Sequence, residues 1–425
     1  MKRHIFSFFL TALTYPMWAQ SSTNSPYSQY GLGLLSDQSQ SFSRGMNGIG
    51  QGLRKGNVVN TLNPASYSAV DSMTMLFDIS LSGQLTNFKE GNNKVNAKNS
   101  SFNHFVGSFR LLKGLGAAFG IMPFSTVGYE YTSTIASSSS ASSASQTFSG
   151  TGGLRQAFIG LGGKITDQLS LGANLAYLWG DIDRVASSPT TAYINSLSRN
   201  YSASVTNYKA DVGAQWVQQI DKNQQLIVGA TVGIGHKLGC DAECSTIETS
   251  ASGTRDTTAL VASNGLEIPM SYSIGATWVK GNVLTLGADL SLQAWGNTKI
   301  PTYNEQTNLY EPASGIMKNR WSFNAGADFV PEATSRKYLK RVHYKIGAGF
   351  ATPYYNINSD NGPSELSISA GFGLPIQNGY NNRSVLNVSA QWVHSSAKDF
   401  ITENTFRINV GITFNERWFF KWKVD

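Results

Sequence analysis

Side chains able to support catalysis or metal binding are scattered along this 425-residue chain, without the spacing that either function requires. No Gly-x-Ser-x-Gly motif for a hydrolase nucleophile is present, and the histidines show no metal-ligand spacing. The run from Gly160 to Lys164 resembles a phosphate-binding loop in composition, but it lies in a strand-like segment that leads into a hairpin. We therefore expect no enzyme activity, no metal site and no cofactor. The histidines are His4, His104, His236, His343 and His394.

Four carboxylates fall on the polar side of strand-like segments. A pair of them would be able to act as general acid and base. The simpler interpretation is a polar lining, with ion pairs to Lys209, Lys345 or Arg407. The carboxylates are Asp78, Asp211, Asp289 and Asp328.

The elements that carry these carboxylates alternate apolar and polar residues. Between Met73 and Leu85, apolar side chains fall on one face and Asp78, Ser80 and Ser82 on the other, which is the pattern of a β-strand. The pattern recurs to Phe414, while only 14% of residues are charged and aromatic residues are abundant. This predicts an all-β fold, an outer-membrane antiparallel barrel of about 14 strands over residues 71–414. The expected strands are 73–87, 102–112, 115–131, 152–165, 168–182, 202–219, 225–239, 266–279, 282–296, 318–330, 342–351, 365–374, 383–394 and 403–414.

The connections between these strands support a barrel rather than a soluble sandwich. Tight turns such as Lys113-Gly114 alternate with longer Ser- and Thr-rich loops such as 240–265 and 297–317, as in barrels with short periplasmic turns and longer outer loops. Aromatic residues near strand ends would form girdles at the two membrane interfaces. These are Trp179, Trp216, Trp278, Trp295, Trp321 and Trp392.

Residues 1–19 have the pattern of a cleaved export signal. A basic start is followed by a short apolar run and by Met17-Trp18-Ala19. We expect export to the outer membrane of a Gram-negative envelope. The net charge of +7 is spread along the chain, so nucleic acid is not an expected partner.

Residues 20–70 do not alternate, yet they carry apolar side chains that need burial. A barrel of fourteen strands has a lumen too wide for its own side chains to fill. This predicts that residues 20–70 form a hatch inside the lumen. Arg44, Arg54 and Lys55 would either anchor this hatch to the wall or bind an anionic head group.

Two further features lie outside this scheme. Cys240 and Cys244 are separated by three residues, which predicts a small disulfide loop in an oxidising compartment. Residues 415–425 form an aromatic and basic C-terminal tail, for which a periplasmic tail, a plug and a prolonged last strand all stay open.

The hatch and several strands resemble the long-chain fatty-acid transporter (FadL-type) family. The resemblance rests on 44–48 and 58–65, including Asn63-Pro64-Ala65, and on Met122-Pro123-Phe124-Ser125 with Gly128. It continues through Ile268-Pro269-Met270-Ser271 and the tryptophans Trp295 and Trp321. It implies a hatch that gates the passage of hydrophobic molecules and a lateral exit where the third strand kinks.

Site residues follow from this resemblance and from the residues themselves. Pro123 lacks a backbone N–H and is flanked by Gly120 and Gly128, which gives a physical basis for a strand-three kink; a bulge that shapes the barrel is the alternative. The outer loops are polar, which departs from a fatty-acid capture site. The expected hatch and ligand residues are Arg44, Gly48, Arg54, Asn63, Pro64 and Ala65.

Two functions from different classes fit this sequence. The first is passive uptake of a hydrophobic or amphipathic small molecule across outer-membrane lipid, gated by the hatch. The second is an accessory barrel of an outer-membrane or periplasmic protein complex for secretion or assembly. The first predicts an apolar pocket at the hatch and an opening at strand three, and the second predicts a sealed lumen.

Overall fold

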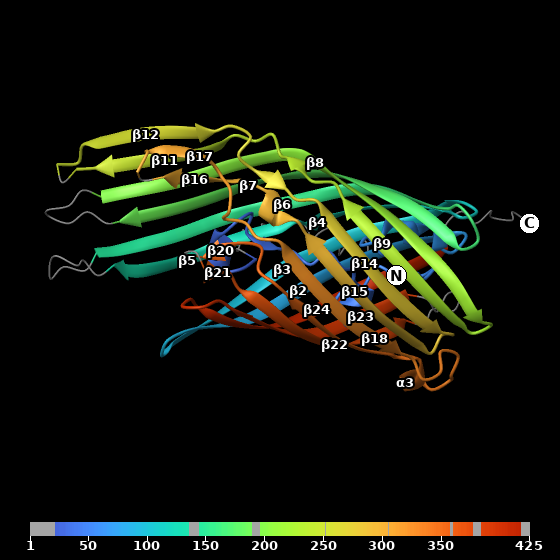
Figure 1. Cartoon of the computed structure of the whole chain (residues 1–425). Helices are drawn as coiled ribbons and strands as arrows, with labels where there is room; N and C mark the ends of the chain where they lie inside the picture. Colours follow the sequence, from blue (N-terminus) through green and yellow to red (C-terminus); the bar gives the residue numbers. More distant parts are fainter. Residues whose placement is uncertain are drawn as a thin grey trace, which may run out of the picture.

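Alternating strands close into a barrel around the chain's N-terminal segment, as a computed structural model shows for residues 22–135, 144–188, 196–250, 252–304, 306–357, 360–376 and 384–417 (Figure 1). The export signal expected at 1–19 lies outside the described residues. Within the described residues, neighbouring strands pair antiparallel, and β24 pairs with β2 to close the barrel. Because β4 and β5 follow one another along β6, they count as one interrupted strand, and the predicted 14-strand all-β barrel is confirmed.

The barrel strands match the predicted segments closely. They are β2 (Thr74–Glu90), β3 (Asn93–Leu112), β4 (Leu115–Pro123), β5 (Ser125–Ile135), β6 (Ala144–Lys164), β7 (Leu169–Ser188), β8 (Ser196–Asp221), β9 (Gln224–Gly233), β14 (Ser271–Lys280), β15 (Leu284–Gln293), β18 (Arg320–Phe329), β19 (His343–Ala351), β22 (Ser364–Ile376), β23 (Ser384–Ser396) and β24 (Thr402–Arg417).

Shorter elements lie at the ends of the barrel and inside it. The small strands are β1 (Leu34–Leu35), β10 (His236–Lys237), β11 (Ala242–Thr249), β12 (Arg255–Ala262), β13 (Glu267–Ile268), β16 (Ile300–Asn304), β17 (Leu309–Ala313), β20 (Asn356–Ile357) and β21 (Asp360–Asn361). The short helices are η1 (Pro26–Gln29), α2 (Ser41–Arg44), η2 (Pro64–Ala69), η3 (Trp295–Asn297) and α3 (Tyr338–Arg341).

Side-chain exposure separates the two faces of each strand. On β24, Phe406 and Ile408 are exposed on the outside, while Asn409 and Thr413 are buried toward the lumen. Successive side chains of a strand point to opposite faces, so this burial pattern gives the barrel an apolar outer surface and a polar inner one. The outer surface is the one that outer-membrane lipid would cover.

The polar loops contain more strand than the sequence predicts. The expected loop 240–265 contains the hairpin β11–β12, and β11 extends the sheet by pairing with β8. The expected loop 297–317 contains the hairpin β16–β17. Apolar alternation misses both hairpins because many of their residues are polar and exposed on one or both faces.

The predicted girdle needs one correction, and the start of the expected tail follows one of the alternatives left open for it. Trp295 is only 1% exposed, because it belongs to η3 and packs with Tyr354 rather than facing lipid. β24 continues to Arg417, so the first three residues of the expected tail prolong the last strand. Residues 418–425 lie outside the described residues.

Candidate functional site

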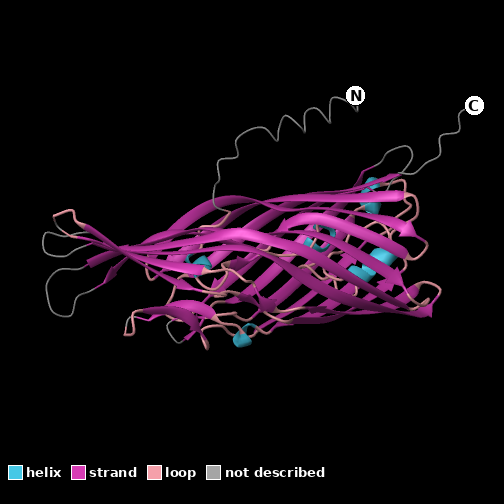
Figure 2. Cartoon of the chain, turned by 90° about the horizontal axis from the view of Figure 1, so that it is seen from above, coloured by secondary structure: helices cyan, strands magenta, loops and turns pink. Residues whose placement is uncertain are grey.

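Residues 22–70, which we call the hatch segment, contact barrel strands around the circumference. Figure 2 shows short helices and loops enclosed by the strands. The hatch-segment side chains Met46, Ile49 and Leu53 are almost fully buried. They pack with Phe42 into one apolar cluster, so apolar side chains of this segment are buried, as expected from the sequence.

Glycines of the barrel wall let the hatch segment contact the strand backbones directly. A Cβ placed on Gly172 would lie 2.4 Å from the carbonyl carbon of Pro64, and one on Gly229 would lie 1.8 Å from the carbonyl oxygen of Gln51. Such distances admit no side chain. A Cβ on other wall strands would likewise come within 3.0 Å of backbone or side-chain atoms of the hatch segment. We call one such glycine from each of nine strands the glycine collar: Gly116, Gly162, Gly172, Gly213, Gly229, Gly287, Gly326, Gly347 and Gly411.

The Asn63-Pro64-Ala65 turn is held at this collar. The Asn63 side chain accepts a hydrogen bond from the Ala65 backbone N–H at 3.1 Å, which caps η2. Its amide also donates to the carbonyl oxygens of Gln51 and Ala214, each at 3.0 Å. Arg54 donates to the Ala65 carbonyl at 3.1 Å. These residues therefore anchor the hatch segment to itself and to β8.

Arg44 and Gly48 also serve the internal structure of the hatch segment. Buried Arg44 donates to Asn409 of β24 at 3.1 Å and to the carbonyl oxygen of Asp37 at 3.2 Å. Burial raises the pKa of Asp37, but Arg44 and the Ser39 N–H lower it more, so the net pKa lies below its ordinary value. Gly48 has a φ of 78°, a left-handed conformation that favours glycine.

Inward carboxylates on β15 and β18 bind the hatch segment, whereas the one on β8 pairs with a lysine of the same strand. Asp289 accepts from the backbone N–H groups of Gly50 at 2.6 Å and Gln51 at 3.0 Å. Asp328 pairs with Lys55 of the hatch segment at 3.1 Å. Asp211 pairs with Lys209, as predicted.

Two of the predicted ion-pair partners form neutral contacts instead. Lys345 donates to the Phe42 carbonyl and to Asn387, each at 2.8 Å, and Arg407 donates to Gln84 at 3.0 Å and Gln391 at 3.3 Å. Both cations therefore donate to uncharged oxygens rather than to a carboxylate.

A cluster of Ser41, His104 and Asp78 brings together the residue types of a catalytic triad. His104 Nε2 lies 3.1 Å from Asp78 and 3.4 Å from the Ser41 hydroxyl, and that hydroxyl also bonds Asp78 directly. In a working triad the histidine stands between the serine and the carboxylate. All three side chains are buried, so this geometry anchors α2 to β2 and β3.

The outer end of the lumen is covered by aromatic side chains from the hatch segment and the loops. Tyr355 donates to the Tyr27 carbonyl at 3.0 Å, and Tyr354 donates to the Gly33 carbonyl. Burial raises the pKa of Tyr27 and Tyr354, so both phenols stay protonated hydrogen-bond donors. We call this layer the aromatic cap: Tyr27, Tyr30, Trp295, Tyr354, Tyr355 and Phe400.

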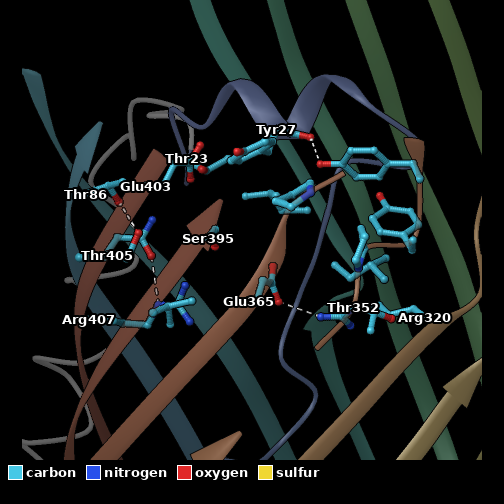
Figure 3. Close-up of a pocket in the computed structure, with 18 residues that line it drawn as sticks. Thr23, Tyr27, Thr86, Arg320, Thr352, Glu365, Ser395, Glu403, Thr405 and Arg407 are labelled. Atoms are coloured by element: carbon cyan, nitrogen blue, oxygen red, sulfur yellow. Dashed lines mark hydrogen bonds and ion pairs between the residues drawn. The ribbon is translucent and has the colours of Figure 1, made fainter. Parts of the chain in front are cut away.

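A cavity of about 90 Å³ lies next to this cap, between the hatch segment and the wall (Figure 3). Tyr27 and Leu35 of the hatch segment line it, but much of its lining is polar. Arg320 and Glu365 form an ion pair of 2.9 Å on one side. Glu403 and Arg407 of β24 project from the other side.

None of the hatch residues singled out from the sequence lines this cavity. Glu403 and Arg407 were missed as cavity residues, although a signal for them exists. They alternate with the lipid-facing Phe406 and Ile408 on the last strand, so the polar register alone places them inside.

The predicted kink corresponds to the break between β4 and β5. Pairing of β4 with β3 ends at Ile121, and β4 itself ends at Pro123. Beyond this point, within the described residues, β5 pairs with β6 and with β1 of the hatch segment instead of β3. Gly120 lies against the Phe105 carbonyl before the break.

The hatch segment forms hydrogen bonds with backbone groups of the wall at this break. The Ser36 N–H donates to the Phe124 carbonyl and Gln38 donates to the Pro123 carbonyl, each at 2.9 Å. Gly128 N–H donates to the Ser28 hydroxyl at 3.1 Å. The hatch segment therefore takes the place of β3 along the free edge of β5.

The expected disulfide is not formed in the structure. Cys240 and Cys244 are both buried free thiols. Cys240 belongs to the apolar cluster that contains Leu238 and Trp295, whereas Cys244 packs with Ala262 and Tyr310. The onset of β11 at Ala242 places the two thiols in separate clusters.

A family model described as BamG matches residues 1–425 of this chain. The chain belongs to the BamG family. No curated protein matches the sequence.

Solved structures similar to this BamG-family chain include two toluene transporters and a FadL homologue. The Pseudomonas putida toluene transporter TodX shares 15% identity, with a TM-score of 0.61 over 92% of this chain and 100% of its own. The Ralstonia pickettii toluene transporter TbuX shares 13% identity, with a TM-score of 0.59 over 92% and 99%. A Pseudomonas aeruginosa FadL homologue shares 11%, with a TM-score of 0.62 over 90% and 99%. The FadL-type resemblance seen in the sequence is thus confirmed for the fold.

No helix in the described residues is long and apolar enough to cross a membrane. In the same part of the chain, no group of three or more His, Cys, Asp and Glu residues could hold a metal ion.

Proposed function

We propose that this BamG-family barrel is an accessory subunit of an outer-membrane protein assembly complex, with its lumen closed by the hatch segment. The observation that carries the proposal is the glycine collar, where a Cβ on any of nine wall strands would come within 3.0 Å of the hatch segment. Membership in the BamG family supports it. A closed barrel offers its surfaces, rather than a pore, to its partners.

The hatch contacts also make opening costly. Release would break the bonds of Asp289 to Gly50 and Gln51, of Asn63 to Ala214, and of Lys345 to Phe42. A buried hydrogen bond contributes about 0.5–1.5 kcal/mol, and a bond to a charged group about 1.5–3 kcal/mol. Together these bonds favour a hatch segment that stays in place.

A second candidate function is passage of a small amphipathic molecule, and the break between β4 and β5 favours it. The hatch segment covers the free edge of β5 there through β1 and a few hydrogen bonds. In this scheme the molecule enters the cavity, the hatch segment moves as a gate, and the molecule leaves laterally at the break. The polar cavity lining favours an amphipathic ligand over a hydrocarbon.

An engineered pair of cysteines between β1 and β5 would distinguish these two functions experimentally. Leu35 and Ser125 are directly opposite each other on β1 and β5. Opposed residues of antiparallel strands have Cβ atoms about 4.5–5.5 Å apart, close enough for a disulfide after a small shift. Leu35→Cys with Ser125→Cys would lock the hatch segment over the break, and each single variant is the control.

The readouts are partner assembly and solute entry, compared in oxidised and reduced cells. For an accessory subunit, the locked barrel supports growth and outer-membrane protein levels as well as the single variants do. For a gate, the locked barrel loses uptake, and reduction restores it. The proposal is wrong if locking abolishes function in this reversible way.

Native extraction in mild detergent tests the partner directly. Protein identification and lipid mass spectrometry on the same sample should find a stoichiometric protein partner and no stoichiometric hydrophobic ligand. A barrel that purifies alone with one hydrophobic molecule per chain would favour the second function instead.

A further inference from the structure

Two residues of β24 with opposite charges, Glu403 and Arg407, line the cavity, and neither forms a direct ion pair within the described part of the chain. Glu403 is only 6% exposed, and its carboxylate accepts a hydrogen bond from the Ser25 hydroxyl at 2.5 Å. Arg407 donates to the neutral side chains of Gln84 and Gln391. By contrast, Arg320 and Glu365 on the other side of the cavity neutralise each other.

Buried charges of this kind are expensive for the fold alone. Removing an ion from water is strongly unfavourable unless an opposite charge or strong hydrogen bonds replace the water. The hatch segment contacts Glu403 through the neutral Ser25 hydroxyl, and Arg407 bonds two neutral glutamines, so these contacts do not neutralise either charge. A ligand that carries both charges would.

The spacing of the two residues sets the size of this ligand. They are four positions apart on one strand, so both point into the lumen with their Cα atoms about 13 Å apart. Allowing about 3 Å for each hydrogen bond leaves about 7 Å between the ligand's charges. Thr405 lies between them on the same face, where its hydroxyl already bonds Thr86 at 2.9 Å.

We propose that the cavity binds a small zwitterion of dipeptide size, with its amine at Glu403, its carboxylate at Arg407 and its peptide group near Thr405. The cavity of about 90 Å³ restricts the ligand to small side chains. Figure 3 shows Glu403, Thr405 and Arg407 along one side of this space. The site is independent of the accessory role, because it uses neither the collar nor a protein partner.

Titration calorimetry on the purified full-length barrel in detergent tests this site, with glycylglycine as the probe. N-acetylglycine lacks the amine, glycinamide lacks the carboxylate, and toluene lacks both. We expect glycylglycine to bind at least 10-fold more tightly than any of the other three. Equal binding of all four, binding of toluene alone, or no binding of glycylglycine would overturn the proposal.

Neutral variants assign each charge. Glu403→Gln should weaken glycylglycine at least 10-fold while leaving N-acetylglycine unchanged, and Arg407→Gln should do the same while leaving glycinamide unchanged. Glu332→Gln, at a half-exposed carboxylate far from the cavity lining, is the matched control. A uniform loss of all probes in both variants would show a structural role and contradict the assignment. Partner assembly measured on the same variants keeps this test separate from the proposed accessory function.

Discussion

Pro64 of the hatch segment lies directly on Gly172 of β7: a Cβ on Gly172 would be 2.4 Å from the Pro64 carbonyl carbon and 2.6 Å from the Ala65 nitrogen. Both obstructing atoms belong to the backbone, so no side-chain rotation can relieve the contact. The position shows how the barrel and its N-terminal segment fit each other, since the wall lacks a side chain where η2 begins.

Gly172→Ala is therefore expected to destabilise the barrel with the hatch segment in its lumen. Overpacking a tight interior typically costs about 1–3 kcal/mol. The measurement is the free energy of unfolding in detergent, followed by heat-modifiable electrophoretic migration or tryptophan fluorescence.

Gly83→Ala is the matched control for this substitution. Gly83 lies in β2, and a Cβ there meets nothing within 4 Å. We expect a change within about 0.5 kcal/mol. Equal effects at Gly83 and Gly172 would mean that the collar does not fix the hatch segment.

Asp289→Ala should loosen the middle of the hatch segment. The carboxylate of Asp289 accepts two backbone N–H groups, from Gly50 and Gln51, and both would lose their partner. A buried donor left without a partner costs about 1–3 kcal/mol. Hydrogen exchange at these two amides should accelerate relative to the natural chain, whereas Asp289→Asn, which keeps one acceptor oxygen, should have a smaller effect. Unchanged exchange in the alanine variant would contradict the anchoring role.

The sequence predicts the barrel well because lipid and lumen impose a strict alternation on each strand. Phe406, Arg407, Ile408 and Asn409 already reveal the two faces of β24. Hairpins such as β11–β12 escape prediction because water covers much of their surface and little apolar alternation arises.

The cavity could not be predicted in the same way. Its residues come from the hatch segment, from β2, β18, β22, β23 and β24, and from the loop that carries Tyr354, which are far apart in sequence. Only the closed barrel brings Thr23, Glu365 and Glu403 around one space. The sequence identified anchors such as Asn63 because the Asn-Pro-Ala motif is local. The register between strands could not be predicted from the sequence, so the residues around the cavity could not be predicted either.

Acid should weaken the hatch segment through Asp37. The pKa of Asp37 in the folded protein lies below its ordinary value of 3.8, because Arg44 and the Ser39 N–H outweigh the effect of burial. A lowered folded pKa stabilises the protein above the ordinary value, and this contribution disappears as pH falls through the folded pKa. The natural chain should therefore lose stability from about pH 4 downward.

Asp37→Asn isolates this contribution. The variant should be less stable than the natural chain at pH 7, and the difference should shrink as the pH falls below about 4 and through the lowered pKa of Asp37. Unfolding in detergent across this pH range gives the comparison. A difference that stays constant across the range would show that the charge of Asp37 plays no part in holding Arg44.

Tyr354→Phe should weaken the aromatic cap without disturbing its packing. The phenol of Tyr354 donates to the carbonyl oxygen of Gly33, and its ring packs against Trp295 and Tyr355. Phenylalanine keeps the ring but leaves the Gly33 carbonyl without this donor, which costs about 0.5–1.5 kcal/mol. Because Gly33 precedes β1, the Ser36 amide beside the β4–β5 break should exchange faster with solvent. Tyr338→Phe, at an exposed position in α3, should leave both stability and exchange unchanged. If the Tyr354 variant also leaves the Ser36 amide unchanged, the cap and the cover over the break are energetically independent.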